Sequence, residues 1–156
     1  MEYLAELARA GRRTLIEFPD CPGCETFAEP DEDVMEVARE ALEGWLETHL
    51  EFGEAPPQPS PRRKAGRSSL AVRVNPALAI ALLLRWRRQE LKLSQAELGK
   101  RLGVTRQQVA LLERPGGNLR VSTLAKAAEA LEVELAVAFE PRVARRSRRM
   151  AASAAR

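Results

Sequence analysis

The chain has 156 residues, of which 45% are hydrophobic and 30% charged, values ordinary for one or two small globular domains. It contains no apolar run near the roughly 18 residues that would span a membrane, and its first residues lack the layout of a secretory signal, so we expect a cytoplasmic protein. Residues 1–60 hold four Arg against fifteen Asp and Glu, a net charge of −11, whereas residues 61–156 hold 21 Lys and Arg against seven Glu, a net of +14. This division predicts a nucleic-acid partner for the basic half and a basic protein partner for the acidic half.

Residues 1–54 are predicted to form a small acidic α/β domain. The first segment, residues 2–9, is compatible with either a helix or a strand. After a turn at Gly11, the alternation over residues 13–18 predicts a strand, and residues 24–28 are predicted to form a short third extended piece. We therefore expect a small sheet at the start of the chain.

A long amphipathic helix is predicted to follow, from Asp31 as its N-cap to about residue 51. Its apolar residues recur every three or four positions, so they would pack on the sheet. The opposite face is acidic and is the expected contact for a basic partner, although a merely solubilising face would look the same. The candidate contact residues are Glu36, Glu40, Glu43 and Glu47.

The two cysteines, Cys21 and Cys24, form a C-x-x-C pair, which is compatible with a redox motif or half of a zinc site. A tetrahedral zinc site needs two further ligands, and the chain has one histidine, His49. The Pro-Gly pair between the cysteines indicates a tight turn rather than the start of a helix. We therefore predict a structural pair, with no metal ion and no cofactor.

The composition changes after the acidic half. Residues 55–68 are rich in Pro and Arg, which excludes a helix and predicts an extended linker. Residues 69–75 alternate like a strand, which we expect to return to the N-terminal sheet. Residues 76–140 are predicted to form a helical domain, and residues 141–156 a basic flexible tail.

The helical domain is expected to begin at the Asn75-Pro76 step. Pro76 suits the first turn of a helix that runs to about residue 91. A second helix over residues 95–102 begins with a capping box formed by Ser94 and Glu97. Gly103 then ends this helix.

Two further helices and a strand are predicted after Gly103. Thr105 is the expected N-cap of a helix that ends near residue 114, and a loop rich in Gly follows. Ser122 is the expected N-cap of a last helix ending near residue 131. The alternation over residues 134–139 then predicts a short C-terminal strand, an exposed edge that two subunits could pair.

The strongest functional signal is the segment 93–113, in which two capped helices are separated by a tight turn. Its apolar positions fall where the inner faces of the two helices would meet; they are Leu98, Leu102, Val104, Val109 and Leu112. This spacing indicates a helix-turn-helix whose second helix enters the major groove of DNA. Over residues 77–133 the chain closely resembles the DNA-binding domains of the phage-repressor class, the Cro/C1 or XRE type.

The exposed face of the second helix of this motif carries the expected base-reading residues. Arg106 can bond guanine and Gln107 adenine through two hydrogen bonds each, and Gln108 is a weaker candidate. The resemblance implies that Gln95 holds a phosphate. The further candidates for DNA contact are Thr105, Lys100, Arg101 and Asn118.

The acidic half has a resemblance of its own. Residues 16–24 (IEFPDCPGC), the acidic helix containing residues 38–42 (AREAL) and the Pro-rich segment resemble the HicB antitoxin family. That family joins a partial ribonuclease-H-like fold to a DNA-binding domain. The resemblance implies neutralisation of a HicA toxin, a small basic ribonuclease, and repression of the shared operon.

The predicted fold class is therefore α+β: a partial ribonuclease-H-like sheet with one long helix, then an all-α helix-turn-helix domain with a short C-terminal strand. The expected partners are operator DNA, a HicA-like toxin and a second copy of the chain, because such motifs read two half-sites. No membrane contact is expected. The protein would be cytoplasmic and associated with the nucleoid when DNA-bound.

Two other functions compete with this one. A nuclease would need converging carboxylates, which Glu2, Glu6, Glu17 and Asp20 do not obviously supply, so we do not expect an enzyme. A stand-alone regulator, whose N-terminal half senses a ligand or drives oligomerisation, remains the alternative function.

Overall fold

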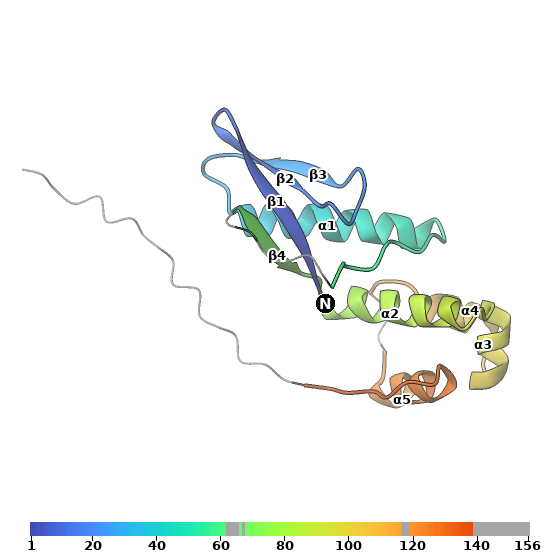
Figure 1. Cartoon of the computed structure of the whole chain (residues 1–156). Coiled ribbons are helices and arrows are strands. Elements are labelled where there is room, and N and C mark those ends of the chain that lie inside the picture. The colour runs from blue at the N-terminus through green and yellow to red at the C-terminus, as the bar shows by residue number, and fades with distance from the viewer. Residues whose placement is uncertain (62–65, 67, 117–118, 139–156) are drawn as a thin grey trace, which may run out of the picture.

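The structure, a computed structural model, describes residues 1–61, 66, 68–116 and 119–138. A four-stranded antiparallel sheet with one long helix is followed by a group of shorter helices (Figure 1). The elements of the first part are β1 (Glu2–Ala10), β2 (Arg13–Glu17), β3 (Glu25–Ala28), α1 (Val34–Glu51) and β4 (Ser69–Arg73). The helices of the second part are α2 (Pro76–Glu90), α3 (Gln95–Leu102), α4 (Arg106–Leu112) and α5 (Val121–Ala130). This is the α+β arrangement that the sequence predicts.

The sheet has the order β3-β2-β1-β4. The ambiguous first segment is strand β1, in which Tyr3 and Ala5 are buried while Glu2 and Glu6 on the other face are exposed. After α1 and the Pro-rich segment, β4 returns to pair with the first half of β1. Because β1 also pairs with β2, the N-terminal strand lies inside the sheet and α1 covers one of its faces (Figure 1).

Helix α1 packs on the sheet through one line of apolar residues four positions apart. These residues are Ala38, Leu42, Leu46 and Leu50. Its N-cap is Asp33, whose carboxylate accepts a 2.8 Å hydrogen bond from the Met35 N–H. The predicted cap Asp31 is therefore wrong by two residues; it lies in a turn that the Glu32 carboxylate closes by accepting from the Glu29 N–H.

The first part of the Pro-rich segment, residues 53–61, has no helix or strand but is packed against the protein. Its backbone carbonyls accept three hydrogen bonds from large side chains. The Tyr3 hydroxyl donates to Pro57 O at 2.8 Å, and the Trp86 indole donates to Pro56 O at 2.7 Å. The Arg85 guanidinium donates to the carbonyl of Glu54 at 2.6 Å. These bonds fix the segment between the sheet and α2.

Helix α2 belongs to both parts of the molecule. Pro76 occupies its first turn as predicted, and the Asn75 side chain caps it by accepting from the Leu78 N–H at 2.9 Å. One face of α2 joins the core formed by the sheet and α1, through Leu78, Ala79, Ala81, Leu82 and Trp86. Leu84 and the following Leu91 instead pack on the core of the C-terminal helices. The two cores are therefore joined by a shared helix.

Two predictions near the C-terminus are wrong. Ser122 is not an N-cap, because α5 begins at Val121 and Ser122 lies inside the helix. Arg120 holds the cap position and makes no capping side-chain bond. The strand expected over residues 134–139 is not formed in residues 134–138, which run on from α5 without a strand partner in the described part of the chain; Phe139 lies outside it. A strand needs a neighbour, and this segment has none among the residues that the structure describes.

None of the helices among the described residues is long and apolar enough to cross a bilayer.

Candidate nucleic-acid interface

Helices α3 and α4 form the predicted helix-turn-helix, with each cap in place. Ser94 and Glu97 bond each other's backbone N–H, at 3.1 and 2.7 Å, in the expected capping box. Gly103 ends α3 in the left-handed conformation, with φ of 67°, which glycine adopts without strain. Thr105 caps α4. Local sequence therefore fixes both helix ends of the motif.

The two helices approach so closely that one position on α3 has room for no side chain. A Cβ at Gly99 would lie 2.8 Å from the backbone oxygen of Val104, in the turn between the helices. Beneath the turn, Leu98 and Val109 pack with Leu131 from the end of α5. The sequence pattern indicates the apolar partners and Gly103 but not Gly99, whose requirement is steric and appears only once the helices are packed.

Helix α4 presents Arg106 and Gln107 to solvent at its N-terminal turn, while Val109 on the opposite side is fully buried. Neither exposed side chain hydrogen-bonds another residue that the structure describes. Leu111, one turn further on, is 58% exposed, so the same face ends in an apolar side chain. The face thus combines hydrogen-bonding groups with a methyl-bearing group, the types that read base edges in the major groove.

The side chains of Gln108 and Thr105 form hydrogen bonds within the motif. The Gln108 side-chain oxygen accepts from the Thr105 N–H at 2.9 Å, and the Thr105 hydroxyl accepts from the Gln108 N–H at 3.2 Å. This second capping box fits the same sequence pattern, which accepts Gln as well as Glu at the third helical position, although only the Thr105 cap was predicted. It leaves Arg106 and Gln107 as the unoccupied polar side chains of the first turn of α4.

A buried ion cluster holds the end of α4 against α2 and α3. Glu113, the C-cap of α4, is completely buried and accepts hydrogen bonds from Arg88 at 2.5 and 2.9 Å. The Arg85 guanidinium lies 3.4 Å from the same carboxylate, and its other end donates to the carbonyl of Leu50 at the end of α1. Burial lowers the pKa of Arg85, which Glu113 opposes. Sequence periodicity did not single out these residues, because charged residues are expected on the surface.

The structure places the expected phosphate-binding residues in different surroundings. Gln95 is half-buried at the first turn of α3 and donates to Glu113 at 3.1 Å, so the ion cluster orients it. Lys100 is exposed on α3. Arg101 is turned away to the end of α5, where it donates to Ala130 O at 3.1 Å and pairs with Glu132. Asn118 lies outside the described residues.

The four acidic candidates on α1 are not equivalent. Glu40 is exposed, and Glu36 is exposed but paired with Arg39. Glu47 is half-buried. Glu43 accepts a 2.8 Å hydrogen bond from the backbone N–H of Asn75, so it helps to hold the start of α2. The helix therefore offers a smaller acidic surface than its sequence suggests.

A second acidic surface, which the sequence pattern did not reveal, lies on the face of the sheet that points away from α1. The strand register places Glu17 directly opposite Glu6 on one side and Glu25 on the other. All three are exposed, and the next row carries Phe27, which is 47% exposed, opposite Leu15. Like charges directly opposite each other oppose sheet formation, so this row is not explained by sheet stability.

The two cysteines flank a tight turn between β2 and β3. The turn between β2 and β3 is closed by Cys24 O accepting from the Phe18 N–H at 3.1 Å and by Phe18 O accepting from the Cys21 N–H at 2.8 Å. Both thiols are buried and unbridged, and burial raises the pKa of Cys21 to about 12 and that of Cys24 to about 11. Thiols in that state are poor nucleophiles and poor metal ligands at neutral pH.

Comparison with known proteins finds a match in each half of the chain. The family described as a HicB-like antitoxin of bacterial toxin-antitoxin systems matches residues 11–68, and a helix-turn-helix family matches residues 84–137. Antitoxin HicB 1 of Photorhabdus laumondii subsp. laumondii is 29% identical over 125 residues, which are 80% of this chain and 77% of that protein. A solved chain from a HicA3 and HicB3 toxin-antitoxin complex aligns at 23% identity and a TM-score of 0.40, over 49% of this chain and 100% of that one. The chain is therefore similar to a HicB-like antitoxin domain over residues 11–68 and to a helix-turn-helix domain over residues 84–137, the combination that its sequence predicts.

Proposed function

We propose that this protein is the antitoxin of a type II toxin-antitoxin system, which neutralises a HicA-like ribonuclease toxin and represses its own operon. The proposal is supported by the two domain assignments and by the α4 face that presents Arg106 and Gln107. The protein would act in the cytoplasm, where its operator lies, without catalysing a reaction of its own.

The DNA-binding part is supported by geometry and charge. A short capped helix with its first turn exposed can enter a major groove about 12 Å wide. Residues 61–156 carry a net charge of +14, which favours association with phosphate through counterion release. Arg106 and Gln107 would read bases, while Gln95 and Lys100 would position the motif on the backbone.

The toxin-binding part is supported by the opposite charge of residues 1–60, a net of −11. Complementary fields accelerate the encounter with a basic protein and orient it. Two surfaces could receive it: the exposed end of α1 with Glu36 and Glu40, or the outer face of the sheet with Glu17 and Glu25.

One set of measurements tests both parts. The full chain should bind DNA from upstream of its own gene more tightly than a scrambled duplex, by fluorescence anisotropy. It should also copurify with a small basic ribonuclease encoded beside it and restore the growth that this ribonuclease arrests. Binding without sequence preference would remove the repressor role, and failure to rescue growth would remove the antitoxin role.

Charge reversal locates the toxin site. Glu17→Lys with Glu25→Lys alters the sheet face, and Glu36→Lys with Glu40→Lys alters the helix face; each pair is exposed, so the fold should tolerate it. The pair that touches the toxin should weaken binding by at least about tenfold, while the other serves as its matched control. Equal and small effects from both pairs would exclude an electrostatic site on either face.

A further inference from the structure

Helix α4 carries one large apolar side chain on its exposed surface. Leu111 is 58% exposed, whereas Val109 is fully buried and Leu112 is half-buried. The structure describes every residue of this helix, and no other apolar residue on it is exposed. A single exposed leucine is common on protein surfaces, so its position must decide what it does.

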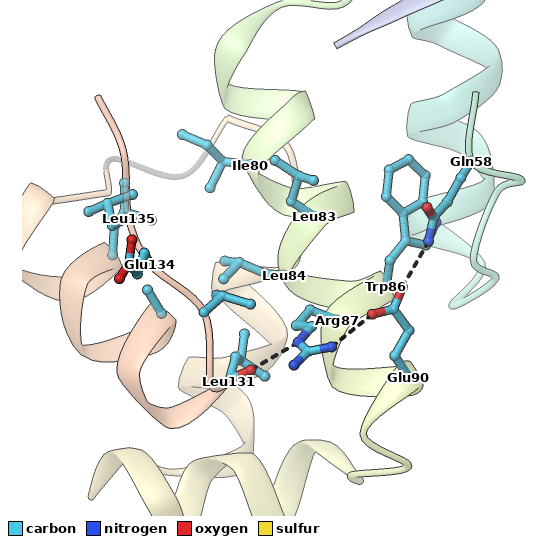
Figure 2. Close-up of a pocket in the computed structure, with 13 residues that line it drawn as sticks. Gln58, Ile80, Leu83, Leu84, Trp86, Arg87, Glu90, Leu131, Glu134 and Leu135 are labelled. Atoms are coloured by element: carbon cyan, nitrogen blue, oxygen red, sulfur yellow. Dashed lines mark hydrogen bonds and ion pairs between the residues drawn. The ribbon is translucent and has the colours of Figure 1, made fainter. Parts of the chain in front are cut away.

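The other exposed leucines in the described part of the chain lie elsewhere. Leu83 on α2 and Leu135 in the segment after α5 line an apolar groove of about 340 Å³, which Figure 2 shows. No residue of α4 lines this groove. Leu111 instead borders an open hollow whose walls are mostly apolar and include Leu112 and Leu119. It is therefore not part of the surface between α2 and α5.

Leu111 lies on the same face of α4 as Gln107. Four positions along an α-helix bring a side chain back to within about 40° of the first, one turn or about 6 Å further along the axis. Val109, two positions before Leu111, points into the core. An orientation that brings Gln107 to the base edges of a major groove therefore brings Leu111 into the same groove.

The major groove offers an apolar group that suits such a side chain. Thymine presents a C5-methyl group there, whereas the other bases are distinguished by their hydrogen-bond donors and acceptors. A leucine side chain forms no hydrogen bonds, so it discriminates by removing apolar surface from water. Burial of one methyl group corresponds to about fourfold in affinity.

We infer that Leu111 contacts the C5-methyl group of a thymine in the operator and so determines the base at that position. The inference rests on the proposed function, because Leu111 reaches a base only if α4 enters the groove. Arg106 and Leu111 are about 7.5 Å apart along the helix, and successive base pairs are about 3.4 Å apart. The thymine therefore lies within about three base pairs of the pair that Arg106 reads.

DNA is favoured over a protein as the group that covers Leu111. A protein seated on Leu111 would also obstruct Gln107 on the same face, and could not be bound together with the operator. The face also presents Arg106, whose side chain has no hydrogen-bond partner among the described residues, and residues 61–156 carry a net charge of +14. These features suit a polyanion.

Deoxyuridine substitution tests the methyl contact without changing the protein. The probe is the shortest duplex from upstream of the chain's own gene that the full chain prefers to a scrambled duplex, measured by fluorescence anisotropy. Deoxyuridine keeps the pairing and the O4 acceptor of thymine and lacks the methyl group. Replacing the thymines one at a time should weaken binding about three- to fivefold at one position of each half-site, within about three base pairs of the pair read by Arg106.

Leu111→Ala connects this penalty to the residue. Leu111 is exposed and alanine favours helix, so the variant should unfold at the wild-type urea midpoint. It should bind the thymine duplex at least about threefold more weakly than the wild type does, and bind the deoxyuridine duplex as tightly as the thymine duplex. Phe52→Ala is the matched control, because Phe52 is 79% exposed at the end of α1; it should keep the full penalty.

Two results would overturn the inference. One is a wild type that binds every deoxyuridine duplex as tightly as the parent duplex, and the other is a Leu111→Ala variant that keeps the penalty. In both cases a preference for the upstream duplex over the scrambled one would leave the repressor role intact. A wild type without that preference would contradict the repressor role and the thymine contact together.

Discussion

At the scale of single residues, polar groups in this protein are used in two opposite ways. Arg106 and Gln107 are left without hydrogen-bond partners among the described residues, whereas Glu113 is fully buried and bonded to Arg88, whose side chain is 11% exposed. A buried carboxylate is tolerated only with such partners. The buried set therefore fixes the position of α4, and the exposed set is available for a ligand.

The buried thiols give a prediction about reactivity. Because burial raises the pKa of Cys21 to about 12 and that of Cys24 to about 11, both should stay protonated and resist Ellman's reagent at pH 8 in the native state. In guanidinium both should react at once. Phe52→Cys provides an exposed thiol as the positive control. Fast native labelling of either cysteine would contradict the structural assignment.

The same shifts predict how stability depends on pH. A solvent-exposed thiol in the unfolded chain ionises near pH 9.0, while the folded thiols keep their protons up to a pKa of about 11 for Cys24 and about 12 for Cys21. Above pH 9 the unfolded state then binds fewer protons, so stability from this source is complete below pH 9 and falls as the pH rises above it. Urea midpoints for the wild type and Cys21→Ala should converge as the pH is raised from 8 to 10.

At the scale of elements, the helix-turn-helix depends on the close approach of α3 to the turn before α4. Gly99→Ala would place a Cβ 2.8 Å from backbone, which cannot rotate away, so we expect a loss of about 1–3 kcal/mol in unfolding free energy. Gly44→Ala is the matched control: Gly44 is exposed in α1 with open space around it, and the change should stabilise by about 0.5–1 kcal/mol. Urea denaturation compares them, and equal effects at both positions would refute the steric role.

Elements fixed by local chemistry were predictable from the sequence. The Ser94 box, Gly103 and Pro76 set helix ends through neighbouring residues, and the structure confirms each of them. Asp31 was mistaken for the cap of α1 because Asp33, two residues on, suits the position equally well, and Ser122 was mistaken for the cap of α5 because that helix begins without a side-chain cap at Arg120. Contacts between segments far apart in the sequence could not be predicted either, because they depend on how the elements pack.

The candidate site was predictable in part. The α4 surface followed from the period of the helix, because a buried Val109 places Arg106 and Gln107 outward. Arg101 could not be excluded from the DNA-binding face in advance, because its side chain bonds Ala130 O, 29 residues away along the chain. The acidic row on the sheet depends on strand register, which a single sequence does not specify.

At the scale of the whole molecule, the two halves are joined by more than the Pro-rich segment. Helix α2 contributes to both cores, and Arg85 connects the end of α1 to Glu113 at the end of α4. Two domains that share a helix and a buried ion cluster should unfold together rather than one after the other.

Arg85→Met tests that connection. The change removes hydrogen bonds to Leu50 O and Glu54 O but leaves Glu113 bonded to Arg88, so we expect a loss of about 1–3 kcal/mol. Calorimetry should show one unfolding transition for the wild type and two separated transitions for the variant. Arg12→Met, in the exposed β1–β2 turn, should leave the wild-type profile unchanged. A variant that still unfolds in one transition at the wild-type midpoint would show that Arg85 does not couple the halves.

The central claim is that α4 reads base sequence through Arg106 and Gln107. Its most direct measurement compares the affinity of wild type, Arg106→Ala and Arg12→Ala for the operator and for operators with single base-pair changes. We expect Arg106→Ala to lose about 1–3 kcal/mol on the operator and to stop discriminating at one base pair, while Arg12→Ala behaves as the wild type. An equal loss on every duplex would make Arg106 a phosphate contact, and no loss at all would contradict the assignment of α4 as the reading helix.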